Sequence, residues 1–312
     1  MHTALFEKIE KIGLVPVVKI DDASKAEGLA KALIDGGLPC AEVTFRTDAA
    51  AEAIGRITKA YPEMLVGAGT VINVEFAKQA VAAGATFIVS PGFNPEVVDW
   101  CIANNVPIVP GVCTPSDIEA GLARGLTTLK FFPAEASGGV NMLRNFAGPF
   151  PNVTFMPTGG INVKNATEYA AQRNVLAVGG SWMVNAALIE AEDWAAISAL
   201  CRDAVATLQG LKLARIGIGT ATEEEAKRVA TLLAAVGIAN LVDEQVEVYA
   251  SDENTKGYLG FSCINAERSA AYLVDRGFTI EESSVQRNAA GKLLSCSFAE
   301  DLGGFALRLF TE

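Results

Sequence analysis

The chain has 312 residues, half of them hydrophobic and a fifth charged, with a formal net charge of −11. This composition supports a large core, while the acidic excess argues against nucleic acid as the main partner, because phosphate backbones need clustered lysine and arginine. The apolar runs are far shorter than the ~20 residues that span a bilayer, and residues 1–11 lack the apolar segment of a signal peptide. We therefore expect a cytoplasmic protein without a membrane partner.

Short β-branched runs alternate with alanine-rich amphipathic runs from residue 14 to about residue 208. The predicted strands are residues 14–20, 40–45, 64–70, 86–90, 106–110, 127–132, 153–158 and 175–179. The predicted helices are residues 24–35, 49–61, 74–83, 95–104, 115–123, 163–172 and 193–208. Eight strands at nearly even spacing, with helices between them, favour a (β/α)8 TIM barrel over a doubly wound sheet. The first domain is predicted to cover residues 1–210.

The regular alternation of strand-like and helix-like segments ends after residue 210. Residues 211–312 are predicted to form a smaller, separate α+β domain. A weak internal repeat relates residues 215–219 to residues 258–262, and the helical runs that follow end near 235–238 and 275–278. The second copy continues through strands that are expected at 281–287, 293–299 and 305–310. The second copy therefore reads as a βαβββ unit.

Several common catalytic sites are excluded by the scarcity of histidine. His2 is the single histidine, and the six cysteines form no CxxC pair. Ser-His-Asp and Cys-His catalysis and zinc sites built on several histidines cannot be assembled from this chain. A general acid or base must therefore be a carboxylate, lysine, tyrosine or cysteine. The cysteines are expected to be reduced and mostly buried.

Polar side chains are concentrated on one face of the predicted strand at 40–45. Side chains alternate between the two faces of a strand, so Glu42, Thr44 and Arg46 share a face that we expect to point into the barrel lumen. Lys130 lies on the predicted strand 127–132 and points into the same lumen by the same alternation. A structural ion pair is one interpretation of this set. The other is chemistry, because an amine nucleophile, a carboxylate and a guanidinium suit Schiff-base formation with a 2-keto acid.

Two glycine pairs follow the last two predicted barrel strands, Gly159-Gly160 and Gly179-Gly180, the second of which precedes Ser181. Glycines let backbone N–H groups approach an oxyanion, and the loops after strands seven and eight are the usual phosphate site of a TIM barrel. The sequence therefore predicts a phosphate site there. Lys19, after the first strand, could add a positive charge.

Six motifs together resemble the 2-keto-3-deoxy-6-phosphogluconate / 4-hydroxy-2-oxoglutarate aldolase family over about residues 1–210. They are EVTFRT (42–47), GAGT (67–70), SPG (90–92), KFFPAE (130–135), PTGGI (157–161) and GGSW (179–182). The resemblance implies a class I aldolase on a (β/α)8 barrel, assembled as a homotrimer and working without a metal or other cofactor. It implies cleavage of 2-keto-3-deoxy-6-phosphogluconate to pyruvate and glyceraldehyde 3-phosphate, or of 4-hydroxy-2-oxoglutarate to pyruvate and glyoxylate. The galactonate-configured substrate, which differs at C4, is the alternative.

The resemblance also implies roles for particular residues. Lys130 corresponds to the Schiff-base lysine and Glu42 to the general acid and base. The implied substrate-binding residues are Arg46, Thr70 and Thr158, with Pro91 and Phe132 as pocket walls. The implied phosphate-binding residues are Lys19, Gly159, Gly160, Gly180 and Ser181. The family often has arginine where this chain has Lys19, so the bidentate fork of a guanidinium is missing there.

Other phosphate-binding barrels, such as isomerases and synthases, lack the set of Glu42, Arg46 and Lys130. A catalytically inactive barrel that serves only in binding or assembly would be expected to lack Lys130 or Glu42, and both are present here.

Residues 211–312 resemble half-repeats of the glyoxalase/vicinal-oxygen-chelate superfamily through the βαβββ pattern and the GGFALRL segment at 303–309. Metal-dependent members of that superfamily use histidine and glutamate ligands. This segment has no histidine, so such a centre cannot form there. An assembly or regulatory domain is the favoured interpretation, and a metal-free small-molecule binding domain is the alternative.

Overall fold

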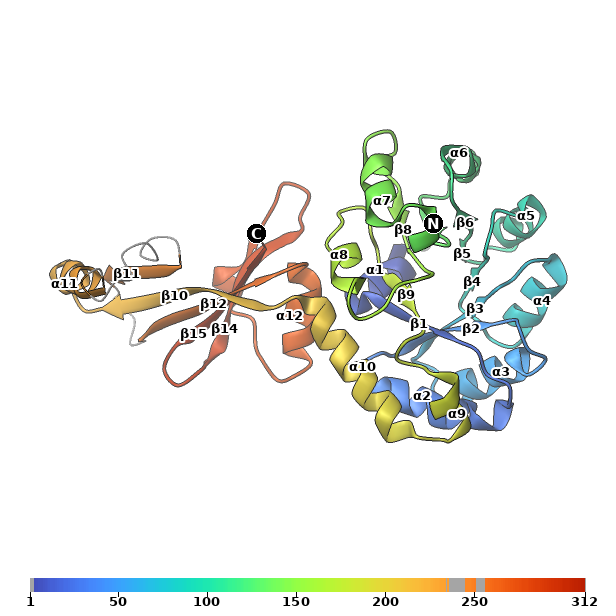
Figure 1. Cartoon of the computed structure of the whole chain (residues 1–312), viewed down its shortest axis with the longest axis horizontal. Helices are drawn as coiled ribbons and strands as arrows, with labels where there is room; N and C mark the ends of the chain where they lie inside the picture. The colour runs from blue at the N-terminus through green and yellow to red at the C-terminus, as the bar shows by residue number, and fades with distance from the viewer. Residues whose placement is uncertain (1–2, 234, 236–244, 251–255, 312) are drawn as a thin grey trace. The chain divides into compact units, whose positions relative to one another are not determined.

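The computed structural model describes residues 3–233, 235, 245–250 and 256–311 (Figure 1). The chain divides into two compact units, Met1–Leu208 and Gln209–Glu312. His2 lies outside the described residues, as do residues 236–238, where the first helical run of the second unit was expected to end. Within the described part of the chain, no helix combines the length and apolarity needed to cross a membrane.

The first unit is a barrel of parallel strands surrounded by helices, as predicted (Figure 1). Its strands are β1 (Leu14–Val18), β2 (Cys40–Thr44), β3 (Leu65–Gly69), β4 (Phe87–Val89), β5 (Ile108–Val109), β6 (Gly111–Val112), β7 (Thr128–Phe131), β8 (Thr154–Phe155) and β9 (Val178–Gly180). β5 and β6 are the halves of one strand, separated by Pro110, which has no N–H to donate. Nine labelled strands thus correspond to eight positions around the barrel.

Two sheets make up the barrel wall, and they are joined to each other at two places. A six-stranded sheet has the order β5-β4-β3-β2-β1-β9 and a three-stranded sheet has the order β6-β7-β8. Pro110 joins the sheets on one side, because its carbonyl accepts a hydrogen bond from the Lys130 N–H. On the other side, parallel bridges pair Phe155 with Val175 and Thr158 with Gly179.

The barrel helices agree with the prediction in most places. They are α1 (Thr3–Ile12), α2 (Ala26–Asp35), α3 (Ala50–Ala60), α4 (Val74–Ala82), α5 (Pro95–Ala103), α6 (Pro115–Leu122), α7 (Gly139–Ala147), α8 (Ala166–Ala170), α9 (Ala186–Glu190) and α10 (Trp194–Gln209). Asn73 and Thr114 cap helices α4 and α6, since each side chain accepts a hydrogen bond from the first turn of its helix. The sequence patterns did not reveal α1, α7 and α9.

The first helix closes the amino-terminal end of the barrel. Ile9 of α1 packs in a buried cluster with residues from the strands, including Val15 and Phe87. Leu5, Phe6 and Leu65 are partly buried against the same cluster. Because this end is filled with apolar side chains, polar chemistry is confined to the carboxyl ends of the strands, where TIM barrels place their sites.

The described part of the second unit is a mixed sheet that packs against two α-helices. Its elements are β10 (Lys212–Thr220), α11 (Glu223–Leu233), β11 (Val246–Ala250), β12 (Gly257–Cys263), α12 (Ala266–Val274), η5 (Glu282–Ser284), β13 (Gln286–Arg287), β14 (Leu293–Asp301) and β15 (Ala306–Thr311). The strand order is β11-β10-β12-β15-β14-β13. The βαβββ order of the second copy is observed from β12 to β15. Ala266 and Ala270 of α12 pack against Phe298, Leu307 and Leu309 of the sheet, which gives this unit its own core.

Candidate active site

The most deeply buried charges in the barrel are Lys130 on β7 and Glu42 on β2. Lys130 Nζ lies 3.1 Å from Glu42 Oε1 and 3.5 Å from Oε2, although the two residues are 88 positions apart. Their side chains are 6% and 1% exposed. The prediction that both residues point into one lumen is confirmed. An amine and a carboxylate in hydrogen-bond contact away from water can exchange a proton, which suits nucleophilic catalysis.

The space around this pair is shaped by Phe132 and Gly69. Lys130 Nζ lies 5.2 Å from the centroid of the Phe132 ring. Gly69 is the last residue of β3, next to Glu42, and a Cβ atom there would lie 2.2 Å from Glu42 Oε1. Only glycine leaves room for the carboxylate. The next residue, Thr70, has φ of 57°, a conformation that β-branched residues rarely adopt.

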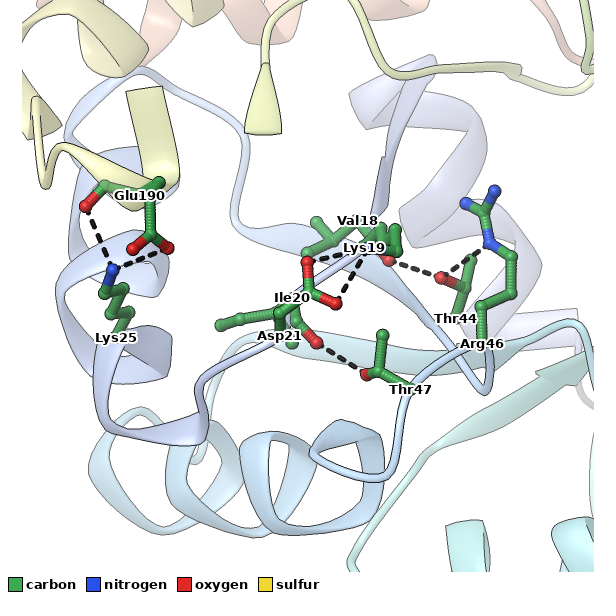
Figure 2. Close-up of polar contacts among 9 residues, drawn as sticks. All are labelled: Val18, Lys19, Ile20, Asp21, Lys25, Thr44, Arg46, Thr47 and Glu190. Atoms are coloured by element: carbon green, nitrogen blue, oxygen red, sulfur yellow. Dashed lines mark hydrogen bonds and ion pairs between the residues drawn. The ribbon is translucent and has the colours of Figure 1, made fainter. Parts of the chain in front are cut away.

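The end of β2 is tied to the end of β1 by side-chain hydroxyls (Figure 2). Thr44 Oγ1 donates to the Val18 carbonyl oxygen at 2.8 Å and accepts a hydrogen bond from Arg46 Nε at 3.1 Å. Thr47 Oγ1 donates to the Ile20 carbonyl oxygen at 2.6 Å. These contacts fix the turn after β2 at the mouth of the barrel.

The expectation that Arg46 would share the lumen with Glu42 is wrong. β2 ends at Thr44, and Arg46 lies in the following turn with an exposed side chain. The alternation of faces that relates Glu42 to Thr44 therefore stops before Arg46. The hydrogen bond to Thr44 nevertheless holds the guanidinium above the carboxyl end of the strand, at the mouth.

The two glycine loops predicted to bind phosphate are neighbours in the structure. The Gly179 N–H donates to the Pro157 carbonyl oxygen at 2.8 Å, which joins the ends of β8 and β9. A Cβ atom at Gly179 would lie 2.2 Å from Thr158 Oγ1. Gly159 and Gly160 have φ of 98° and 80°, a region that favours glycine.

Lys19 and Ser181 flank these loops, and both are exposed. Gly180 pairs with Pro16 of β1, so the middle of β1 lies beside the end of β9. Lys19 Nζ forms an ion pair with Asp21 at 2.7 Å, and the two side chains are 45% and 60% exposed (Figure 2). Asp21 was not considered in the sequence analysis, although an acid two residues from a lysine was visible there.

Pro91 lies close to the strand that pairs with Lys130. A Cβ atom at Gly111 of β6 would lie 2.2 Å from the Pro91 carbonyl oxygen, and Gly111 is the register partner of Lys130. The loop that carries Pro91 is thereby held beside the strand end where the amine lies.

Glu135 and Tyr169 form a second polar contact near the site, which the sequence analysis missed. The buried Tyr169 hydroxyl donates a hydrogen bond to Glu135 Oε1, and burial and the carboxylate both raise the pKa of Tyr169. A Cβ atom at Gly160 would lie 2.6 Å from Glu135 Cβ. Glu135 therefore holds the turn after β7 against the loop after β8. Its place in the KFFPAE motif was a signal, whereas nothing in the sequence singled out Tyr169.

Residues 5–200 match the family described as "Aldolase: KDPG and KHG aldolase". The chain belongs to the KDPG and KHG aldolase family. It is a Schiff-base aldolase, a carbon–carbon lyase, and the resemblance found in the sequence is confirmed. The family match ends before the second unit begins.

Named relatives of the KDPG and KHG aldolase family match over the same region. The chain is 50% identical over 196 residues to the 2-dehydro-3-deoxy-phosphogluconate aldolase of Treponema pallidum, covering 63% of this chain and 93% of that protein. It is 44% identical over 200 residues to the KHG/KDPG aldolase of Escherichia coli, covering 64% of this chain and 92% of that protein. The KDPG aldolase structure from Legionella pneumophila, which has pyruvate captured as a covalent carbinolamine, aligns with a TM-score of 0.62 at 41% identity. That alignment covers 63% of this chain and 96% of that one.

Proposed function

We propose that the protein cleaves 2-keto-3-deoxy-6-phosphogluconate to pyruvate and glyceraldehyde 3-phosphate, or 4-hydroxy-2-oxoglutarate to pyruvate and glyoxylate, through a Schiff base on Lys130. The observation that carries the proposal is the buried contact of 3.1 Å between Lys130 Nζ and Glu42 Oε1. A lysine becomes a nucleophile when a neighbouring base takes its proton, and Glu42 is that base. The names of the relatives support these substrates.

The reaction begins when Glu42 takes a proton from Lys130. The free amine attacks the C2 keto carbon and gives a carbinolamine. Protonated Glu42 returns the proton to the departing hydroxyl, so that water leaves and an iminium forms. Glu42, again a carboxylate, accepts the proton of the C4 hydroxyl while the electrons of the C3–C4 bond move into the iminium. The aldehyde leaves, the enamine is protonated at C3, and water releases pyruvate and the lysine.

The substrate carboxylate is proposed to bind at the mouth of the barrel. Arg46 offers a guanidinium that can hold a carboxylate with two hydrogen bonds, and Thr70 and Thr158 offer hydroxyls. The Phe132 ring beside Lys130 Nζ and the Pro91 loop form the apolar walls. These walls would keep water away from the iminium.

The phosphate is proposed to bind at the loops that carry Gly159, Gly160, Gly180 and Ser181. The closeness of the two loops, joined at Gly179 and Pro157, supports this role. Backbone N–H groups exposed at glycines form an anion-binding concavity. Lys19 can contribute only if the phosphate replaces or shares its present partner, Asp21.

Trapping with borohydride tests the chemistry. Reduction in the presence of pyruvate should add the mass of a reduced pyruvate adduct to the peptide that contains Lys130, and Lys130→Ala should show neither adduct nor turnover. Normal turnover by Lys130→Ala would refute the proposal. Values of kcat/KM for the phosphorylated and the non-phosphorylated substrate, and for the two C4 epimers, would then rank the candidates.

We further propose a cytoplasmic homotrimer in which residues 1–210 form the aldolase domain and residues 211–312 form a separate, non-catalytic domain. The trimer follows from the family resemblance, and the six free cysteines support a reducing compartment. Sedimentation velocity at several concentrations tests the assembly. A species of about three times 32.7 kDa is expected, and a monomer at every concentration would contradict it.

A further inference from the structure

The second unit has a hollow on the face of its sheet that α12 does not cover. Leu307 and Leu309 of β15 pack with α12, so the residues that alternate with them, Arg308 and Phe310, point to the opposite face. A cavity of about 460 Å³ lies there. Its charged lining comes from Arg215, Glu247 and Arg308, and its other polar lining residues include Tyr258, Ser295 and Ser297.

The two arginines of this hollow flank a glycine of the sheet. Gly260 of β12 pairs with Arg215 of β10 on one side and with Arg308 of β15 on the other. The two arginine backbones are therefore two strand spacings apart, or roughly 10 Å. A Cβ atom at Gly260 would lie 3.1 Å from the Phe310 ring and 3.2 Å from Arg215 Cβ. The Tyr258 ring lies at 3.2 Å as well, so the absence of a side chain at Gly260 lets both aromatic rings pack against the strand between the two arginines.

Both guanidinium groups rest on aromatic rings, and neither donates a hydrogen bond to a residue in the described part of the chain. Arg308 Cζ lies 4.0 Å from the centroid of the Tyr258 ring, and Arg215 Cζ lies 5.4 Å from that of Phe310. Among the residues that the structure describes, neither arginine forms an ion pair, whereas Arg287 of the same unit pairs with Glu267 at 2.6 Å. Stacking fixes a guanidinium in place while its edge stays available for an oxyanion.

The acidic group of the hollow is already engaged. The Tyr258 hydroxyl donates to Glu247 Oε2 at 2.5 Å. Burial and the Glu247 carboxylate raise the pKa of Tyr258 to about 12, so this hydroxyl stays neutral at physiological pH. Two positive charges therefore face one negative charge, and Ser295 and Ser297 supply further polar groups. A local excess of positive charge is notable in a chain with a net charge of −11.

We propose that this hollow binds a small organic anion through its carboxylate or phosphate group, with Arg215 and Arg308 as the two ligands of the oxyanion. The rings of Tyr258 and Phe310 would contact the carbon skeleton. The site is separate from the aldolase chemistry, and it gives the second domain a metal-free binding role rather than a role in assembly alone.

Calorimetric titration of the full-length protein, with succinate and with inorganic phosphate at constant ionic strength, tests the proposal. Succinate has no keto group and cannot form a Schiff base with Lys130, and the two probes separate carboxylate from phosphate recognition. Binding of at least one probe should weaken tenfold or more in Arg308→Gln and in Arg215→Gln. Arg276→Gln is the matched control, since Arg276 also stacks on a tyrosine, at 3.5 Å from the Tyr272 ring, but lies outside the hollow.

Aldolase activity should be unchanged in all three variants, and circular dichroism melting checks their folding. If loss of the stacking on Tyr258 unfolds the Arg308 variant, the exposed Arg215 keeps the test available. Equal binding by the wild type and the arginine variants would overturn the proposal, because the anion would then bind elsewhere. Absence of binding by both probes would overturn it too. The proposal would also fail if the protein self-associated without a bound anion and the arginine variants abolished that self-association.

Discussion

Replacing the buried Lys130–Glu42 pair by methionines should separate the stability of the barrel from its chemistry. At 3.1 Å and an effective dielectric constant of about 20, the two charges attract each other by about 5 kcal/mol. Desolvation of both groups offsets most of this attraction. Lys130→Met or Glu42→Met alone leaves one buried charge without a partner and should cost about 3–5 kcal/mol of unfolding free energy. The double variant should cost no more than about 1 kcal/mol, since methionine matches glutamate in length and is only one atom shorter than lysine.

The two single variants and the double variant form a double-mutant cycle. Their free energies of unfolding can be measured in the intact protein by urea unfolding followed through tryptophan fluorescence. All three tryptophans, Trp100, Trp182 and Trp194, belong to the first unit, so excitation of tryptophan reports on the barrel and not on the second unit. The coupling energy should be at least about 5 kcal/mol, and all three variants should be inactive. Single effects that add to the double effect within about 0.5 kcal/mol would refute the reasoning, because the two side chains would then be independent.

Three further predictions concern single residues. Gly179→Ala should lower kcat/KM at least about tenfold, because its methyl carbon would displace the Thr158 hydroxyl, and unchanged kinetics would contradict this. Thr70→Asn should stabilise the barrel by about 1 kcal/mol in urea unfolding, because asparagine tolerates positive φ better than threonine does; a less stable variant would argue against strain there. Thiol titration at pH 8 should label the partly exposed Cys113 first, since burial raises the pKa of both Cys101 and Cys201 to about 12; equally fast labelling of a second cysteine would contradict it.

The centre of the site could be predicted because strand alternation is a local rule with long-range consequences. Glu42 and Lys130 each lie in the middle of a strand, where the alternation holds, and closure of the barrel brings the two strands to a common lumen. The position of Arg46 could not be predicted in this way. The strand ends two residues earlier, and the hydrogen bond to Thr44 that holds the guanidinium depends on the tertiary path of the turn.

The missed helices show where local signals fail. α7 begins at Gly138 and Gly139, both with positive φ, and has no side chain capping its first turn. A pair of glycines normally indicates a turn, so the helix that follows was not recognised. The fifth strand was likewise predicted to end at Pro110, whereas it continues beyond this proline as β6, Gly111–Val112. The carbonyl of this proline still accepts a hydrogen bond from Lys130, which keeps the two sheets joined.

The interior of this barrel is built around polar groups at the end that carries the chemistry. Gly69 makes room for the Glu42 carboxylate and Gly179 for the Thr158 hydroxyl, at positions where side chains would otherwise fill the lumen. A buried ion pair is weak evidence for stability, because an apolar replacement of similar volume is often as stable or more so. The lumen therefore contains polar groups that the fold does not require, and glycines that make room for them. This combination is expected of a site that must accept a keto acid beside an amine, and it separates the catalytic end of the barrel from the apolar end closed by α1.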